Sequence, residues 1–230
     1  MTTSTRRVPK RTRAGTQHRA EAARRAATRR LLVRVAVLAV IAVGILYFVT
    51  RRGGDEAVGP DGPPCAVGEP GPGSQAPAIE LASTAGTTYN LAVDGAGKTV
   101  LLYFQEGIGC QPCWTQMTDI EDRFADFETL GIDQMVTITV DNIDDLRRKL
   151  DDEGISSLVL ADPEVSLGDT YTANQYGMMG TSTYGHTFTV VGPDGTIRWR
   201  ADYGGSPNYT MYVEPDALLA HLSEGLASAS

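Results

Sequence analysis

The segment TVLLYFQEGIGCQPCW, residues 99–114, joins an unbroken apolar run to a pair of cysteines. Residues 99–104 are apolar without alternation, as expected for a central strand that is buried on both faces of a sheet. A glycine-containing turn then leads to Cys110 and Cys113 in a CxxC pattern. From residue 111 to 130 apolar side chains recur every three or four positions, which predicts an amphipathic helix. The two cysteines are therefore expected where a buried strand passes into a helix.

The pattern continues with further strands and helices. The other expected elements are strands at 78–81, 88–91, 135–140, 158–161, 187–191 and 196–201, and helices at 143–150, 166–176 and 215–226. Asp141 or Asn142 is a suitable cap for the helix at 143–150. The turn GPDG at 192–195 joins the last two strands in a hairpin. This order predicts an α/β fold with a mixed sheet and helices on both faces.

Charge is divided unevenly along the chain. Residues 1–52 hold 13 of the 20 Lys and Arg residues, whereas residues 53–230 hold 27 of the 28 acids. The acidic part offers no surface for nucleic acid, so no nucleic-acid partner is expected. Residues 31–49 are apolar except for Arg34. Such a helix would span about 28 Å, close to the thickness of the hydrocarbon core of a bilayer.

The basic residues lie mainly before this span, so the positive-inside rule places the N-terminus in the cytoplasm. The predicted parts are a basic cytoplasmic leader (1–30), a transmembrane signal-anchor (31–50), a Gly/Pro-rich linker (51–76), an α/β domain (77–226) and a tail (227–230). The chain is thus expected in the cell membrane as a single-pass protein, with its domain outside the cytoplasm. A cleaved signal peptide is the alternative, although RRGGDEAVG after the span is a poor cleavage site.

The CxxC pattern suits a redox dithiol. Cys110 would lie at the helix N-terminus, where unpaired N–H groups and the helix dipole stabilise a thiolate, with Pro112 in the first turn. Cys113, one turn further on the same face, would resolve a mixed disulfide. A structural disulfide is the alternative, but closing so short a loop stabilises a fold by only about 2 kcal/mol. Structural zinc needs four ligands, and Cys65, the remaining cysteine, is alone; it is expected to be an incidental thiol or to pair between molecules.

With these features the chain resembles the thioredoxin-like superfamily over residues 71–226. The resemblance rests on GSQAPAIEL (73–81), on TVLLYF before CQPC, and on the later YGMMG and GPDG. It is closest to the redoxin branch, which includes membrane-anchored thiol–disulfide oxidoreductases of the TlpA/ResA type and AhpC/TSA peroxiredoxins. It implies a thioredoxin-like fold, Cys110 and Cys113 as a redox-active disulfide, and protein thiol or disulfide partners outside the cytoplasm. No dissociable cofactor is implied.

The sequence departs from the family pattern around the dithiol. The usual tryptophan before the first cysteine is Gly109, and Trp114 follows the second cysteine instead. The family's cis-proline is missing, since residues 164–192 contain no proline. Ser182 or His186 is expected in its place.

The peroxidase signature PxxxTxxC is also absent. If Cys110 is taken as the signature cysteine, the threonine position is occupied by Gly107. If Cys113 is taken instead, that position is occupied by Cys110. The peroxidase hypothesis is therefore weaker than the dithiol hypothesis. Glu106, four residues before Cys110, is either a proton relay during exchange or a solvated turn residue.

His186 supports a second hypothesis of a different class. It precedes a strand and the GPDG turn, and this stretch is similar to SCO-type copper-insertion proteins. That resemblance implies Cys110, Cys113 and His186 as copper ligands, and two thiolates with an imidazole suit copper. The SCO spacing is CxxxC, however, whereas this chain has CxxC. His186 could equally be a hydrogen-bonded structural residue or tune the dithiol. A non-catalytic binding module that retains the fold is the third hypothesis.

Overall fold

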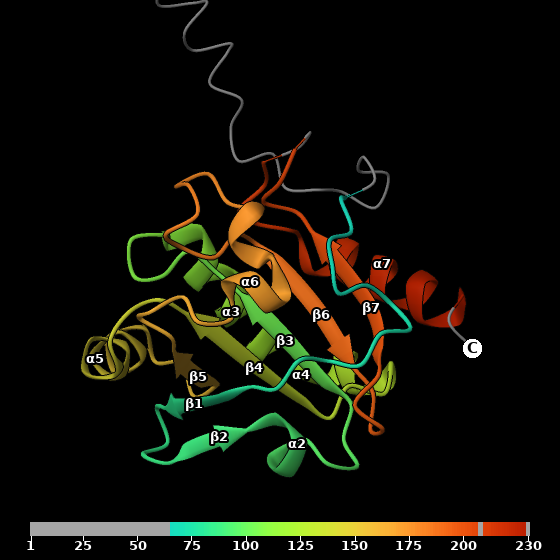
Figure 1. Ribbon diagram of the computed structural model, residues 1–230, viewed down its shortest axis with the longest axis horizontal. Helices are drawn as coiled ribbons and strands as arrows, with labels where there is room; N and C mark the ends of the chain where they lie inside the picture. Colours follow the sequence, from blue (N-terminus) through green and yellow to red (C-terminus); the bar gives the residue numbers. More distant parts are fainter. Residues whose placement is uncertain (1–64, 207–208, 229–230) are drawn as a thin grey trace, which may run out of the picture. The chain divides into compact units, whose positions relative to one another are not determined.

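The computed structural model describes residues 65–206 and 209–228. Their strands are β1 (Glu80–Ser83), β2 (Thr88–Asn90), β3 (Val100–Phe104), β4 (Gln134–Thr139), β5 (Leu158–Ala161), β6 (Thr187–Val191) and β7 (Ile197–Asp202). The helices are α2 (Leu91–Asp94), α3 (Gln111–Asp122), α4 (Phe124–Thr129), α5 (Ile143–Glu153), α6 (Gly168–Tyr171), the short 3₁₀ helix η1 (Ala173–Gln175) and α7 (Pro215–Ser228). Figure 1 shows them as one sheet with helices on both faces.

The sheet is mixed, as predicted, and its strand order is β2-β1-β5-β4-β3-β6-β7. The central strands β3, β4 and β5 are parallel to one another, while the flanking pairings are antiparallel. Every residue of β3 is buried, which explains its unbroken apolar run. The hairpin predicted around GPDG is confirmed as β6 and β7.

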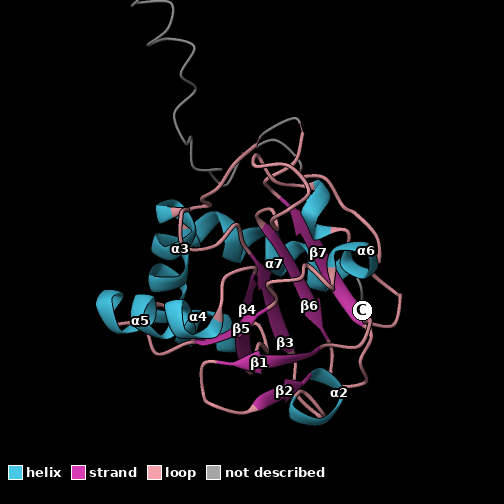
Figure 2. Ribbon diagram, turned by 60° about the vertical axis from the view of Figure 1, so that its left-hand side comes forward, coloured by secondary structure: helices cyan, strands magenta, loops and turns pink. Residues whose placement is uncertain are grey.

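Helices cover the two faces of the sheet unequally. On one face α3, α4, α5 and α7 pack over a core that includes both cysteines. On the other face α2 and α6 cover a smaller core around Phe104 and Tyr171. In Figure 1 α6 lies in front of the sheet and α3, α4 and α7 lie behind it; Figure 2 shows α3, α4 and α5 together at one side. The dithiol thus belongs to the more heavily covered face.

The helix predicted at 111–130 is two helices, α3 and α4. Arg123 breaks it, since its φ of −112° and ψ of 18° lie outside the helical region. Its side chain contacts Asp126 of α4 and Asp216 of α7. The break leaves the apolar face continuous, because Ile120 and Phe127 still pack into the same core.

The helix predicted at 166–176 is also shorter than expected. Thr172 has a φ of 50°, a left-handed conformation that ends α6 and separates it from η1. The strands expected at 78–81 and 88–91 are found as β1 and β2. Leu91 begins α2 instead, because the Asn90 side chain accepts a hydrogen bond from the N–H of Ala92 and caps that helix. The predicted Asn142 cap of α5 is confirmed, since its side chain accepts from Asp145 N.

The N-terminal segment, residues 65–76, lies along the edge strand β7. Ala66 pairs with Asp202 and Gln75 pairs with Thr196. The N–H groups of Gly73 and Ala76 also donate to carbonyls of the β6–β7 hairpin. Composition predicts a linker up to residue 76, but the part from residue 65 onward is paired with the domain. The paired part of the chain therefore begins before the predicted boundary at residue 77.

A buried ion pair fixes this segment to the sheet. The Arg200 guanidinium contacts the Asp202 carboxylate at 2.9 Å, and neither side chain is exposed. Asp202 also accepts hydrogen bonds from Gly68 N at 2.6 Å and from Thr187 Oγ1 at 2.7 Å. Arg200 Nη1 donates to the carbonyl of Pro70 at 3.3 Å. The N-terminal segment thus supplies part of the hydrogen bonding of both charges.

The predicted leader and signal-anchor, residues 1–50, lie outside the described residues, as does the linker up to residue 64 and part of the tail. Within the part of the chain that the structure describes, no helix is both long and apolar enough to cross a bilayer.

Candidate functional site

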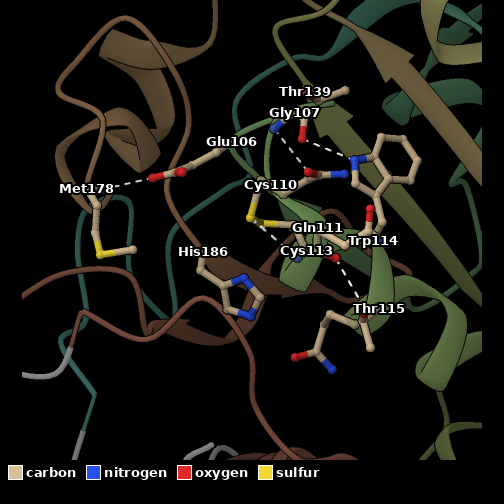
Figure 3. The surroundings of a disulfide bond; sticks show 12 residues. Glu106, Gly107, Cys110, Gln111, Cys113, Trp114, Thr115, Thr139, Met178 and His186 are labelled. Atoms are coloured by element: carbon tan, nitrogen blue, oxygen red, sulfur yellow. Dashed lines mark hydrogen bonds between the residues drawn. A yellow bond between two sulfur atoms is a disulfide. The ribbon is translucent and has the colours of Figure 1, made fainter. Parts of the chain in front are cut away.

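Cys110 and Cys113 lie at the junction of β3 and α3, as the sequence predicts. They form a disulfide with a Cα–Cα distance of 5.4 Å. Cys110 is the N-cap of α3 and its Sγ accepts a hydrogen bond from Cys113 N at 3.3 Å. Pro112 lies in the first turn. Figure 3 shows the disulfide with Trp114 on one side and His186 on the other.

Cys110 is more exposed than Cys113, as disulfide exchange requires of the attacking cysteine. Cys110 is 8% exposed and Cys113 is fully buried. A partner can therefore reach Cys110 first. The Cys113 N–H is directed at Cys110 Sγ, and together with the positive end of the α3 dipole it stabilises the Cys110 thiolate when the bond is reduced.

Glycine at position 107 is required by the loop that precedes Cys110. Gly107 has a φ of 107°, and a Cβ at this position would lie 2.2 Å from Asp141 Oδ2. That same oxygen accepts a hydrogen bond from Ile108 N at 2.8 Å. The Asp141 carboxylate therefore occupies the space that a threonine at position 107 would need. This loop therefore has no room for the threonine of the peroxidase signature.

Two further side chains hold the loop from within the core. Gln105 is fully buried, and its Oε1 accepts from Gly107 N at 3.0 Å. Trp114, also fully buried, donates from Nε1 to the Gly107 carbonyl at 3.1 Å. The tryptophan that follows the motif therefore positions the turn that precedes it.

Glu106 connects the loop to a second loop above the disulfide. Its Oε1 accepts from Met178 N at 2.9 Å, as Figure 3 shows. Met178 and Met179 are exposed by 50% and 68%. Glu106 is thus engaged in a loop-to-loop contact.

His186, rather than Ser182, lies beside the disulfide. Ser182 is exposed in the loop before β6. His186 is fully buried directly before β6, and its Nδ1 is 2.9 Å from the hydroxyl of Tyr103. The same hydroxyl donates to the Cys113 carbonyl at 3.4 Å. Tyr103 therefore links His186 to the first turn of α3.

Burial makes this pair electrically neutral. It lowers the pKa of His186 from 6.5 to about 3. It also raises the pKa of the Tyr103 hydroxyl well above its ordinary value. Both groups remain uncharged at physiological pH, so the space beneath the disulfide carries hydrogen-bonding capacity but no charge.

The copper hypothesis gains no support from this geometry. Among residues 65–206 and 209–228, no group of three or more His, Cys, Asp or Glu side chains is arranged to hold a metal ion. His186 Nδ1 has Tyr103 as its partner, while its Nε2 is buried without a hydrogen-bond partner. The thiol of Cys65 is half-buried against the same core cluster, where burial raises its pKa and makes it a poor nucleophile.

The sequence did not point to several residues of this site. Tyr103 is part of an apolar strand and reads as a core residue. Gln105 and Asp141 are single polar residues at the ends of β3 and β4, and their position after adjacent parallel strands is the signal that could have found them. Lys149, which contacts Gln111 of the motif, is 38 residues away in the chain.

Comparison with known proteins decides the family. A family model described as AhpC/TSA matches residues 72–200. The chain belongs to this family. The membership confirms the resemblance to the redoxin branch of the thioredoxin-like superfamily and the thioredoxin-like α/β fold. Membership of this family also indicates that this AhpC/TSA protein is an oxidoreductase.

Solved structures share the fold of this AhpC/TSA protein at low sequence identity. The peroxidoxin BcpB of Mycobacterium tuberculosis matches with a TM-score of 0.53 and 17% identity, over 69% of this chain and 96% of its own. AhpC of Enterococcus faecalis matches with a TM-score of 0.57 and 16% identity, over 69% and 93%. The reduced 2-Cys peroxiredoxin of Plasmodium vivax gives 0.53 and 18%, over 64% and 77%. No curated protein sequence matches the chain.

Proposed function

We propose that this AhpC/TSA protein is a thiol–disulfide oxidoreductase that exchanges electrons with protein partners through Cys110 and Cys113. The observation that carries the proposal is the disulfide at the N-terminus of α3, with Cys110 as the N-cap and more exposed than Cys113. A helix N-terminus favours the thiolate form of the first cysteine. The second cysteine lies within one turn and can reach the same sulfur.

The reaction follows from these positions. In the reduced protein the Cys110 thiolate attacks one sulfur of a partner disulfide, and the other partner sulfur leaves with the electron pair. Cys113 then loses its proton and attacks Cys110 Sγ. This step re-forms the Cys110–Cys113 bond. The partner sulfur that was bonded to Cys110 in the mixed disulfide leaves as a thiolate and takes a proton. The protein is oxidised by two electrons and the partner is reduced by two, without a dissociable cofactor.

Replacing Cys110 is expected to abolish this activity. With the full-length protein in detergent, insulin reduction by dithiothreitol should fall to the uncatalysed rate in Cys110→Ser. Cys113→Ser should instead accumulate a mixed disulfide, because the attacking sulfur remains and the resolving sulfur is lost. Cys65→Ser is the matched control and should keep the full rate. A Cys110→Ser protein that retains the rate would contradict the proposal.

A peroxidase is the second candidate, because the family and the similar structures include peroxiredoxins. The loop around Gly107 argues against it, since Asp141 fills the space of the signature threonine. Peroxide consumption by the same protein separates the two functions. Fast peroxide turnover without insulin reduction would replace the exchange proposal with the peroxidase.

We also propose that residues 31–50 anchor the protein in the cell membrane with its domain outside the cytoplasm. The apolar span and the ten basic residues before it support this topology. The full-length protein is expected to stay with the membrane fraction after alkaline carbonate extraction. A variant with Leu38→Arg and Ile41→Arg should be extracted, because charges at the centre of the span oppose insertion. Complete release of the unaltered protein would contradict the anchor.

A further inference from the structure

The CxxC motif is bound to helix α5 through its own glutamine. Lys149 Nζ donates to Gln111 Oε1 at 3.1 Å and to Glu153 Oε1 at 2.5 Å. Gln111 Nε2 also approaches Glu153 Oε1 at 3.4 Å. The three side chains therefore close a ring between α5 and the first residue of α3. Figure 2 shows the two helices at the same side of the sheet.

Lys149 is more buried than the other cations of α5. Its side chain is 17% exposed, and its Nζ lies 5.6 Å from the centre of the Trp114 ring. Such a position over an indole stabilises a cation. Arg147 and Arg148 form ion pairs with their own helix, but their side chains are 41% and 70% exposed. The charge of Lys149 is thus fixed beside the motif. It contacts Gln111, which precedes Cys113, and Trp114, which follows Cys113.

The other charged and titratable groups around the dithiol lie on different elements. Glu106 and Asp141 bring carboxylates to the loop before Cys110. Glu153 adds a third carboxylate beside Lys149. Tyr103 and His186, on the sheet side, are neutral. The ammonium of Lys149 is thus paired with one carboxylate, that of Glu153, and its removal would leave the charge beside the motif more negative.

We propose that Lys149 is a positioning residue for the exchange reaction, whose charge, held against Gln111 and Trp114, stabilises the Cys110 thiolate. This inference rests on the proposed function and deepens it. The fixed ammonium acts in the same sense as the positive end of the α3 dipole. Glu153 acts in the opposite sense, because its carboxylate disfavours a nearby thiolate. The glutamine of CQPC thereby becomes the residue that connects the motif to a charged pair outside it.

The test measures the ionisation of Cys110 in the full-length reduced protein. Thiolate absorbance is recorded against pH, and Cys113→Ser/Cys65→Ser is the background so that a single thiol titrates. Lys149→Met keeps the aliphatic stem over Trp114 but removes the charge. It is expected to raise the pKa of Cys110 by about 0.5 unit or more. Lys149→Arg should restore most of the shift, and Glu153→Gln should lower the pKa of Cys110.

Arg148→Met is the matched control, because it removes an exposed cation from the same helix. It should shift the pKa of Cys110 by less than half as much, and added salt should erase that smaller effect first. Equal shifts in Lys149→Met and Arg148→Met would overturn the proposal, as would shifts of the same sign in Lys149→Met and Glu153→Gln. A merely structural role would produce neither opposite signs nor rescue by arginine.

Insulin reduction by the unaltered protein separates failure of this inference from failure of the proposed function. If the protein reduces insulin and Lys149→Met leaves both that rate and the pKa of Cys110 unchanged, the role of Lys149 is wrong and the function stands. If the unaltered protein does not reduce insulin, the function itself is wrong, and with it the role of Lys149 in exchange.

Discussion

Replacing Arg200 with methionine is expected to lower the free energy of unfolding by about 3–5 kcal/mol, because it leaves the Asp202 carboxylate buried without its cation. Neither side chain of the pair is exposed. Methionine is close to arginine in length and fills the aliphatic part of the space. Asp202 would keep hydrogen bonds from Gly68 and Thr187, but these cannot replace a full charge in a dry environment.

Denaturant unfolding measures this loss of stability. Two further variants serve as comparisons for it. Arg198→Met removes an ion pair to Asp194 on the same hairpin, where the side chains are 38% and 54% exposed. That change should cost less than about 1 kcal/mol. The double variant Arg200→Met/Asp202→Leu should recover much of the stability, because it removes both buried charges. Equal small losses in Arg200→Met and Arg198→Met would show that the buried pair contributes no more than a surface pair.

Acidification is expected to destabilise the protein through His186. Burial lowers the pKa of His186 from 6.5 in an exposed chain to about 3. The unfolded state therefore binds a proton below pH 6.5 that the folded state does not bind until about pH 3. Unfolding becomes more favourable as the pH falls through this window, by up to about 1.4 kcal/mol per pH unit for this single group. Above pH 6.5 the histidine is neutral in both states, and its contribution does not change with pH.

The variant His186→Phe isolates this contribution. Other groups also titrate in the acid range, so the measured quantity is the difference in unfolding free energy between the two proteins at each pH. That difference should change steadily between pH 6 and pH 4, in the direction that makes the variant relatively more stable at low pH. A difference that stays constant with pH would contradict the burial of a neutral histidine. Oxidised protein must be used throughout, since the disulfide contributes separately to stability.

Local sequence predicts the central part of the fold well. The apolar runs before the cysteines and at residues 135–140 are β3 and β4, and GPDG marks the β6–β7 hairpin. The breaks at Arg123 and Thr172 were missed, because an amphipathic pattern can continue across a single non-helical residue. The pairing of residues 65–76 was missed for a different reason. It depends on Asp202 and Arg200, more than 120 residues away, which composition does not reveal.

The site divides in the same way. The N-cap position of Cys110 and the burial of Cys113 follow from a strand, a turn and a helix that are adjacent in the chain. The choice between Ser182 and His186 required the structure, because the loop before β6 has no apolar pattern to fix its alignment. The contact of Lys149 with Gln111 joins two helices that pack on the same face of the sheet. Only the assembled fold brings that charge to the motif.

The position of Trp114 makes its fluorescence a probe of the redox state of the dithiol. The chain has two tryptophans. Trp114 directly follows Cys113 and, like Trp199, belongs to the core cluster that contains both sulfurs; the Trp199 indole lies against Gly225 of α7. A disulfide in contact with an indole quenches its fluorescence, and reduction to thiols relieves the quenching. Opening and closing of the Cys110–Cys113 bond will therefore change the emission of Trp114, so that electron transfer can be followed in real time without a dye.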